Sequence, residues 1–104
     1  MPWQPLADLA DLADRNVIGV THGERKLAIY RLEDGVYATT DVCPHAAARL
    51  SAGEVVEGYI ECPGHFALFD IRTGQSGGGL ATGNLTTYPV RVEGTKIYVL
   101  LDEA

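Results

Sequence analysis

Four metal-binding side chains lie in two short pairs along this chain of 104 residues. Cys43-Pro44-His45 is the first pair, Cys62-Pro63-Gly64-His65 is the second, and the segment 46–61 separates them. The chain has only two cysteines and three histidines, so His22 alone lies outside these pairs. Each pair places one sulfur and one nitrogen in a turn shaped by proline or glycine. Two such turns facing each other would gather all four side chains at one point.

Three kinds of site use such a set. A structural zinc ion accepts two cysteines and two histidines, although zinc fingers usually pair cysteine with cysteine and histidine with histidine. A catalytic Cys–His pair would use one pair and leave the other unexplained. A 2Fe–2S cluster in which two cysteines hold one iron and two histidines hold the other uses all four. Chemistry favours this third site, because each turn can give its cysteine to one iron and its histidine to the other.

The charge balance excludes several classes of partner. Fourteen Asp and Glu against eight Lys and Arg give a formal net charge of −6, whereas nucleic acids and anionic membranes need a basic face. The start of the chain does not resemble a signal peptide, and no apolar run reaches the roughly 18 residues of a membrane span. We therefore expect a cytoplasmic protein, in which cysteines serve metals or catalysis more often than disulfides.

Short β-rich runs dominate the chain and predict an all-β fold in a single domain, 1–104. The Asp34-Gly35 and Glu93-Gly94 steps predict two hairpins. The Leu-Ala-Asp repeat at 6–14 predicts one short helical turn after an initial strand, and the glycines at 77–79 and 83 indicate a flexible or closely approached loop. The expected architecture is a small antiparallel sandwich or barrel. The expected strands are 17–20, 26–32, 36–39, 59–62, 68–71, 88–92 and 97–101.

The four-residue pattern resembles that of bacterial Rieske-type 2Fe–2S ferredoxins, which serve multicomponent aromatic-ring-hydroxylating dioxygenases. The similarity extends from Trp3 to about Leu101. It includes the flanking segments Ala48-Arg49-Leu50-Ser51-Ala52-Gly53, Ile60-Glu61-Cys62-Pro63, Phe69-Asp70, Arg72-Thr73-Gly74 and Tyr88-Pro89-Val90. The resemblance implies a Rieske-type sandwich or barrel. A cluster-binding subdomain at about 42–83 is then inserted between strands of a base formed by about 1–41 and 84–104.

The resemblance implies one Rieske 2Fe–2S cluster per chain. Cys43 and Cys62 would be the thiolate ligands of the buried ferric iron. His45 and His65 would bind the outer iron, which cycles between ferric and ferrous, and their outer ring edges would lie near solvent. No residue is expected to be catalytic, because a carrier performs no substrate chemistry.

Two departures from high-potential Rieske proteins predict a low reduction potential. Those relatives use a serine and a tyrosine hydroxyl to hydrogen-bond the cluster and its cysteine, and the matching positions here are Ala67 and Phe69. Fewer donors to sulfur leave the reduced cluster less stabilised. The negative net charge acts in the same direction. We expect a potential near the low end of the Rieske range, on the order of −150 mV.

Several residues around the ligands are candidates for partner docking. The family usually has glycine where Ala46 follows the first histidine and proline where Leu80 lies in a third loop. Phe66 replaces a residue that is more often polar, and it could equally belong to the core. An apolar rim around the histidine edges, shaped for a particular oxygenase, is one interpretation. The candidate surroundings of the cluster are Pro44, Ala46, Pro63, Gly64, Phe66 and Leu80.

Polar residues elsewhere receive ordinary structural roles. His22 is expected in an exposed turn and Asp41 as a turn cap. Arg49 and Arg72 are expected in surface salt bridges. Trp3 is expected on a strand that anchors the N-terminus in the core.

The sequence thus predicts a soluble monomeric one-electron carrier, not an enzyme. It would accept electrons from an NAD(P)H-dependent flavoprotein reductase and deliver them to a terminal Rieske oxygenase. A terminal oxygenase itself needs a mononuclear iron site with two more histidines and a carboxylate, whereas only His22 remains. The alternatives are the small Rieske-like subunit of a nitrite reductase and a non-redox, zinc-stabilised interaction module.

Overall fold

The computed structural model describes residues 3–42, 48–63, 67–78 and 84–101. Within these ranges the chain forms three antiparallel sheets and two short 3-10 helices, η1 (Leu9–Leu12) and η2 (Leu50–Ala52). The all-β prediction is therefore confirmed. No helix in the described part of the chain is long and apolar enough to cross a membrane.

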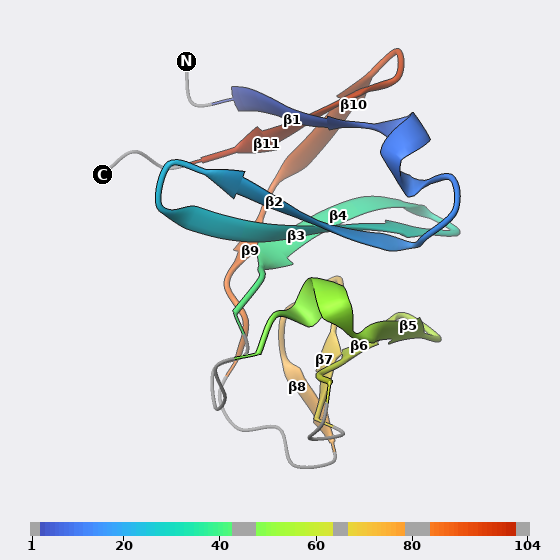
Figure 1. Ribbon diagram of the computed structural model, residues 1–104. Helices are drawn as coiled ribbons and strands as arrows, with labels where there is room; N and C mark the ends of the chain where they lie inside the picture. Colours follow the sequence, from blue (N-terminus) through green and yellow to red (C-terminus); the bar gives the residue numbers. More distant parts are fainter. Residues whose placement is uncertain (1–2, 43–47, 64–66, 79–83, 102–104) are drawn as a thin grey trace.

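Two of the sheets stack at the top of Figure 1. One has the order β1-β11-β10, and the other has the order β2-β3-β4-β9. The strands of the first sheet are β1 (Trp3–Asp8), β10 (Val90–Glu93) and β11 (Lys96–Leu100). The strands of the second are β2 (Val17–His22), β3 (Arg25–Leu32), β4 (Gly35–Thr40) and β9 (Thr87–Tyr88).

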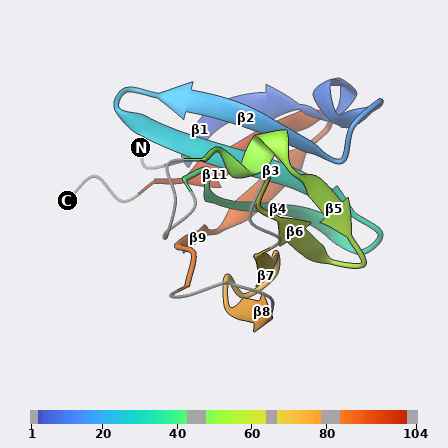
Figure 2. The ribbon, with the colours of Figure 1, turned by 60° about the horizontal axis from the view of Figure 1, so that its bottom comes forward.

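The third sheet lies below the second and has the order β5-β6-β7-β8. Its strands are β5 (Glu54–Val56), β6 (Tyr59–Glu61), β7 (Leu68–Asp70) and β8 (Ser76–Gly78). The chain leaves the second sheet after β4, forms this sheet, and returns as β9 beside β4. Thr39 pairs with Thr87 there, and the Thr40 N–H donates to the Thr86 carbonyl at 2.9 Å. Figure 2 shows β5, β6, β7 and β8 side by side in this order, with β9 at a distance from them.

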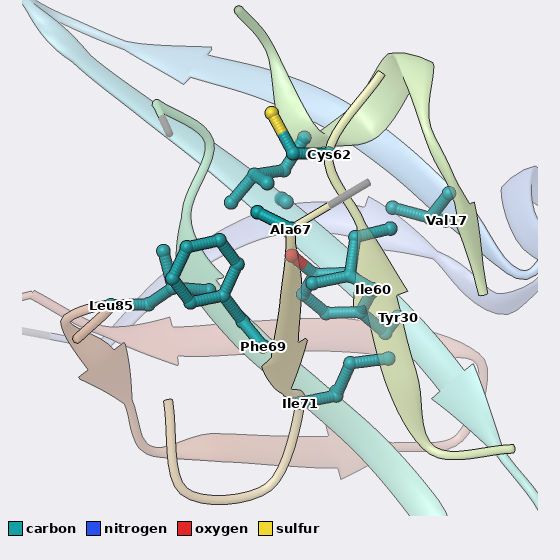
Figure 3. Close-up of a cluster of buried hydrophobic side chains, with 10 residues drawn as sticks. Val17, Tyr30, Ile60, Cys62, Ala67, Phe69, Ile71 and Leu85 are labelled. Carbon is teal, nitrogen blue, oxygen red and sulfur yellow. The ribbon is translucent and has the colours of Figure 1, made fainter. Parts of the chain in front are cut away.

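Strand β3 separates two hydrophobic clusters, because alternate side chains of a strand point to opposite faces. Leu27 and Ile29 pack toward the β1-β11-β10 sheet, in a cluster with Leu12, Ala38, Ile97, Val99 and Leu101. Ala28 and Tyr30 pack on the other face, toward β6 and β7. All four of these β3 residues are fully buried. We call the cluster on the Tyr30 side the lower cluster, and Figure 3 shows it in close-up. Its buried members are Val17, Ala28, Tyr30, Leu50, Ile60, Cys62, Ala67, Phe69, Ile71 and Leu85.

The predicted hairpins are largely confirmed. Leu32 pairs with Gly35 across the Glu33-Asp34 turn, and Glu93 pairs with Lys96 across the last turn. The predicted strand 88–92 is wrong as a single element. Pro89 has no N–H to donate and interrupts it, so that β9 pairs with β4 whereas β10 pairs with β11.

The predicted helical turn after an initial strand is also confirmed, and its capping explains where it begins. Asp8 ends β1 in an extended conformation and accepts a hydrogen bond from the Ala10 N–H at 3.0 Å. The Asp11 carboxylate in turn accepts from the Asp8 N–H at 3.0 Å. This reciprocal capping box satisfies two backbone donors at the start of the short helix.

Two of the other expectations need correction. Trp3 lies on a strand but is only half-buried, with the Arg91 guanidinium 5.2 Å from its ring centroid, so it lies outside both buried clusters. His22 is the last residue of β2 and pairs with Arg25, so it lies in a strand and not in an exposed turn. The glycine-rich run at 76–78 is strand β8. A Cβ at Gly77 would lie 2.2 Å from the Tyr59 ring, which agrees with the expected close approach.

Candidate metal centre

Of the four predicted ligands, the structure describes Cys62. Cys43, His45 and His65 lie outside the described residues, as do Pro44, Ala46, Gly64, Phe66 and Leu80 of the predicted surroundings. Among the residues that are described, no group of three or more His, Cys, Asp or Glu side chains could hold a metal ion. The geometry of the site is therefore built from Cys62 and from the residues that flank the other ligands.

Cys62 follows β6 directly and is buried, with 1% of its surface exposed. Its N–H donates to the Ala67 carbonyl at 2.8 Å, which extends the ladder between β6 and β7 beyond the Glu61–Leu68 pair. The segment 63–66, which contains His65, therefore connects two strands that are held together up to its ends. Pro63, which begins this segment, is half-buried, and its carbonyl lies 3.8 Å from the Cys62 Sγ.

The two ends of the segment that carries Cys43 and His45 are also joined by backbone contacts. Val42 and Arg49 form an isolated antiparallel bridge across it. The Leu50 N–H donates to the Asp41 carbonyl, and the Asp41 N–H donates to the Lys26 carbonyl, both at 2.8 Å. These bonds join the two ends of the segment to each other and attach them to β3, an inner strand of the second sheet.

Both ligand segments adjoin the lower cluster. Cys62 and Ala67 flank the second segment, and Ala48 and Leu50 follow the first; Leu50 is fully buried and Ala48 packs against the cluster. Leu85, which follows the segment 79–83, is buried in the same cluster. In Figure 3 the Cys62 sulfur lies at the end of the cluster and points away from Ile60 and Ile71. The fold therefore brings the chain after the first predicted ligand turn, and the chain on both sides of the second, to one apolar platform.

Among the described residues, Cys62 packs with the apolar side chains of the lower cluster. Ala67 and Phe69, the positions at which high-potential relatives carry hydroxyls, are both fully buried in the lower cluster with Cys62. Tyr30 supplies a hydroxyl in this cluster, and it lies 2.8 Å from Thr39 Oγ1. Burial raises the pKa of Tyr30, so that this hydroxyl remains protonated.

The donor set fits a mixed-ligand 2Fe–2S cluster. Two cysteines and two histidines match its two irons, and Cys62, the one predicted ligand that the structure describes, is a buried thiol at the end of an apolar platform. The apolar side chains around Cys62 restrict water at the sulfur.

Sequence reasoning missed a buried polar group beside the first ligand segment. Asp41 has no exposed surface, and its carboxylate accepts hydrogen bonds from Arg49 and Ser51. Asp41 thus does more than cap a turn, and Arg49 is not in an ordinary surface pair. The available signal was position, because the acid directly precedes the first ligand segment and its partners directly follow it.

Arg72 behaves as predicted. Its guanidinium makes two hydrogen bonds to the exposed Asp34 carboxylate, at 2.9 and 3.0 Å, and lies 5.6 Å from the Tyr37 ring centroid. The hydrogen bonds from Arg72 hold the pKa of Asp34 below its ordinary value. This pair joins the β3–β4 turn to the turn after β7, away from the ligand segments.

Comparisons with known proteins identify the family of this chain. The family model of the Rieske [2Fe-2S] domain matches residues 2–89. The ferredoxin component of the naphthalene 1,2-dioxygenase system of Pseudomonas aeruginosa is 38% identical over 97 residues, which are 93% of this chain and 93% of that protein.

Solved structures give the same result. The ferredoxin of carbazole 1,9a-dioxygenase from Nocardioides aromaticivorans IC177 superposes with a TM-score of 0.90 at 31% identity, over 98% of this chain and 100% of that one. A chain from a complex of reduced oxygenase and oxidized ferredoxin in carbazole 1,9a-dioxygenase gives a TM-score of 0.88 at 32% identity, over 99% of this chain and 96% of that one. The chain therefore belongs to the family of Rieske [2Fe-2S] proteins, and over nearly its whole length it is a ferredoxin of the kind found in aromatic dioxygenase systems.

Proposed function

We propose that this protein is a one-electron carrier that passes electrons from an NAD(P)H-dependent flavoprotein reductase to a terminal Rieske ring-hydroxylating oxygenase. The observation that carries the proposal is the buried Cys62 thiol on an apolar platform against which Ala48 and Leu50, after the first ligand segment, also pack. The similar complex of reduced oxygenase and oxidized ferredoxin in carbazole 1,9a-dioxygenase supports the choice of acceptor.

In this proposal Cys43 and Cys62 hold one iron, and His45 and His65 hold the other. Bound in this way, the cluster supplies one electron at a time without substrate chemistry. The chain's own contribution is to exclude water from the Cys62 sulfur and to withhold hydroxyl donors from it at Ala67 and Phe69. Pro44, Ala46, Pro63, Gly64, Phe66 and Leu80 form the proposed surroundings at which partners dock.

The division into two lobes belongs to the same proposal. The sheet β5-β6-β7-β8 lies in the segment 42–83, between β4 and β9. We assign this segment as the cluster-binding subdomain and about 1–41 and 84–104 as the base. The adjacent ends of the segment, joined by the Thr40–Thr86 hydrogen bond, support this assignment. We further propose a monomer in the cytoplasm that binds neither nucleic acid nor membranes, consistent with the net charge of −6.

Spectroscopy of the purified protein tests the proposal. The oxidised holoprotein is expected to be red-brown, to bleach on reduction, and to give the EPR signal of a Rieske cluster with a low average g value. His45→Ala and His65→Ala are expected to abolish the signal, because each removes an iron ligand. His22→Ala is the matched control and should retain it. A colourless protein that contains one zinc ion would contradict the proposal and favour the zinc-stabilised interaction module.

A further inference from the structure

A buried carboxylate lies at the base of the first ligand segment. Asp41 Oδ1 accepts the Ser51 N–H at 2.6 Å, and Oδ2 accepts the Ser51 hydroxyl and Arg49 Nε, each at 2.7 Å. Arg49 Nη2 lies 2.7 Å from the same Oδ2. Because Asp41 has no exposed surface, its charge is tolerated only with such partners. An apolar packing of similar volume often stabilises a fold as well, so the arrangement points to a role in fixing geometry.

The partners of Asp41 determine what is fixed. Asp41 precedes the segment 42–48, and Arg49 and Ser51 follow it, so the carboxylate bonds both chain ends of the segment that carries Cys43 and His45. The Val42–Arg49 bridge and the hydrogen bond from Leu50 to the Asp41 carbonyl join the same ends through the backbone. The carboxylate bonds also hold the side chains of Arg49 and Ser51.

Helix η2 connects the Asp41 network to the second ligand segment. Ser51 lies in η2, and Gly53 directly follows it. A Cβ at Gly53 would lie 1.9 Å from the Glu61 carbonyl oxygen, so the backbone after η2 lies directly against the residue that precedes Cys62. Leu50 of η2 also packs in the lower cluster with Cys62. A displacement of η2 would therefore change the position of Cys62.

Strand β2 closes the arrangement from the base. A Cβ at Gly19 would lie 2.6 Å from Ser51 Oγ, 3.0 Å from Asp41 Oδ2 and 3.1 Å from Arg49 Nη2. The absence of a side chain at Gly19 thus leaves the space that this network occupies, although Gly19 has no positive φ that would require glycine.

We propose that Asp41 is a positioning residue that, through Arg49, Ser51 and η2, holds the segment carrying Cys43 and His45 in a fixed relation to the segment carrying Cys62 and His65. In this role Asp41 acts through the chain ends that it joins. The inference rests on the proposed cluster site. It adds that retention of the cluster depends on Asp41 as well as on the four ligands.

The test compares holoproteins of the wild type and of Asp41→Asn. An asparagine at this position keeps the shape, but it presents an NH2 group to neighbours that are themselves donors. We expect the visible absorbance to bleach in an iron chelator about tenfold faster than in the wild type. We also expect the EPR lines of the reduced protein to broaden, because a less defined ligand geometry spreads the g values.

Milder variants test the network in case Asp41→Asn retains no cluster. Ser51→Ala removes one donor and Gly19→Ala introduces a methyl group among the three side chains, so both should bleach faster and broaden the EPR lines. Ser51→Thr keeps the hydroxyl and should behave more like the wild type than Ser51→Ala does.

Two controls separate positioning from loss of stability. Asp34→Asn breaks an exposed Asp–Arg pair away from the ligand segments, and Val99→Ala weakens the core between the two upper sheets. Both should keep the wild-type EPR line shape, even where unfolding becomes easier. If Asp41→Asn or Ser51→Ala bleaches no faster than a control of equal stability and keeps the wild-type line shape, the inference is wrong. A wild-type protein that holds no cluster would instead overturn the proposed function.

Discussion

At the scale of single residues, the properties of the site depend on groups that are absent as much as on those present. Ala67 and Phe69 are both fully buried beside Cys62, and neither carries a hydroxyl. A hydroxyl that donates to a thiolate stabilises the more negative, reduced state and raises the potential. The two positions therefore give a direct way to change the potential without touching a ligand.

Ala67→Ser and Phe69→Tyr are each expected to raise the midpoint potential. The hydrogen bond is present in both oxidation states, so only its extra strength toward the reduced cluster raises the potential. A whole hydrogen bond to a charged acceptor contributes about 1.5 kcal/mol or more, roughly 60 mV for one electron, and the expected shift is a part of this, on the order of tens of mV. Potentiometric titration followed by EPR measures the shift. Phe69→Leu is the control that changes the side chain without adding a donor. A variant that loses stability with an unchanged potential would show that the new hydroxyl does not reach the sulfur.

Gly53 lies at another sensitive position. In Gly53→Ala the new Cβ would lie 1.9 Å from the Glu61 carbonyl oxygen. The backbone must therefore move at Glu61, the residue that precedes Cys62. Overpacking of this kind costs about 1–3 kcal/mol. Urea unfolding should show the loss, and the visible spectrum of the holoprotein should change with it.

Gly23→Ala serves as its control. Gly23 has a φ of +63° and nothing within 4 Å of a Cβ, so that substitution strains the turn alone. It should lower the free energy of unfolding by about 1 kcal/mol and leave the spectrum unchanged. An unchanged spectrum in Gly53→Ala as well would contradict the coupling between η2 and Cys62.

At the scale of elements, the sequence was most informative where a turn residue and a strand pattern agreed. Glu33-Asp34-Gly35 gave the β3–β4 hairpin, because two strands joined by a two-residue turn need nothing from the rest of the chain. The split between β9 and β10 could not be predicted from composition. It depends on which strand each half pairs with, and that is set by the distant β4 and β11.

The same reasoning explains how much of the site was visible in the sequence. Spacing and chemistry name Cys62 as a ligand without the fold, and this assignment stays a prediction; the structure shows that Cys62 is buried. The network of Asp41, Arg49 and Ser51 was not found. These residues are common in turns, and only tertiary contacts with η2 show that the carboxylate is buried.

Two exposed carboxylates that bond separate elements predict an acid-dependent loss of stability. The Arg72 guanidinium lowers the pKa of Asp34, and the Ala10 N–H followed by the Thr95 hydroxyl lowers that of Asp8, both from an ordinary value of 3.8. Their stabilisation is complete above about pH 4 and is lost as the pH falls through the lowered pKa values. Thermal unfolding from pH 5 to pH 2 measures it.

Asp34→Asn should show a shallower decrease in Tm over this acid range, because it lacks one of the two groups. It should also lower Tm slightly near pH 7, where the wild type has the full contribution. Added salt should reduce both differences, since the pair is exposed to solvent. An identical acid profile in the two proteins would show that the Asp34–Arg72 pair makes no contribution in solution.

At the scale of the whole molecule, the net charge of −6 affects how partners meet. Charged proteins associate faster when the potentials of their surfaces are complementary, and salt screens this attraction. The rate at which the reductase reduces the oxidised protein should therefore fall as ionic strength rises from about 20 mM to about 500 mM. Stopped-flow absorbance at a series of salt concentrations measures it, and a rate independent of salt would exclude electrostatic steering.

The adjacency of β4 and β9 has a consequence for the order of folding. The strands β2, β3 and β4 follow one another through short turns and can pair from local contacts. The pairing of Thr39 with Thr87, in contrast, closes a loop of nearly fifty residues. Such a closure carries an entropic cost that grows with loop length, and non-local strand pairing slows folding. The completion of the second sheet therefore waits for the third sheet to become compact, so a newly made chain brings its ligand segments together before its last strands are in place.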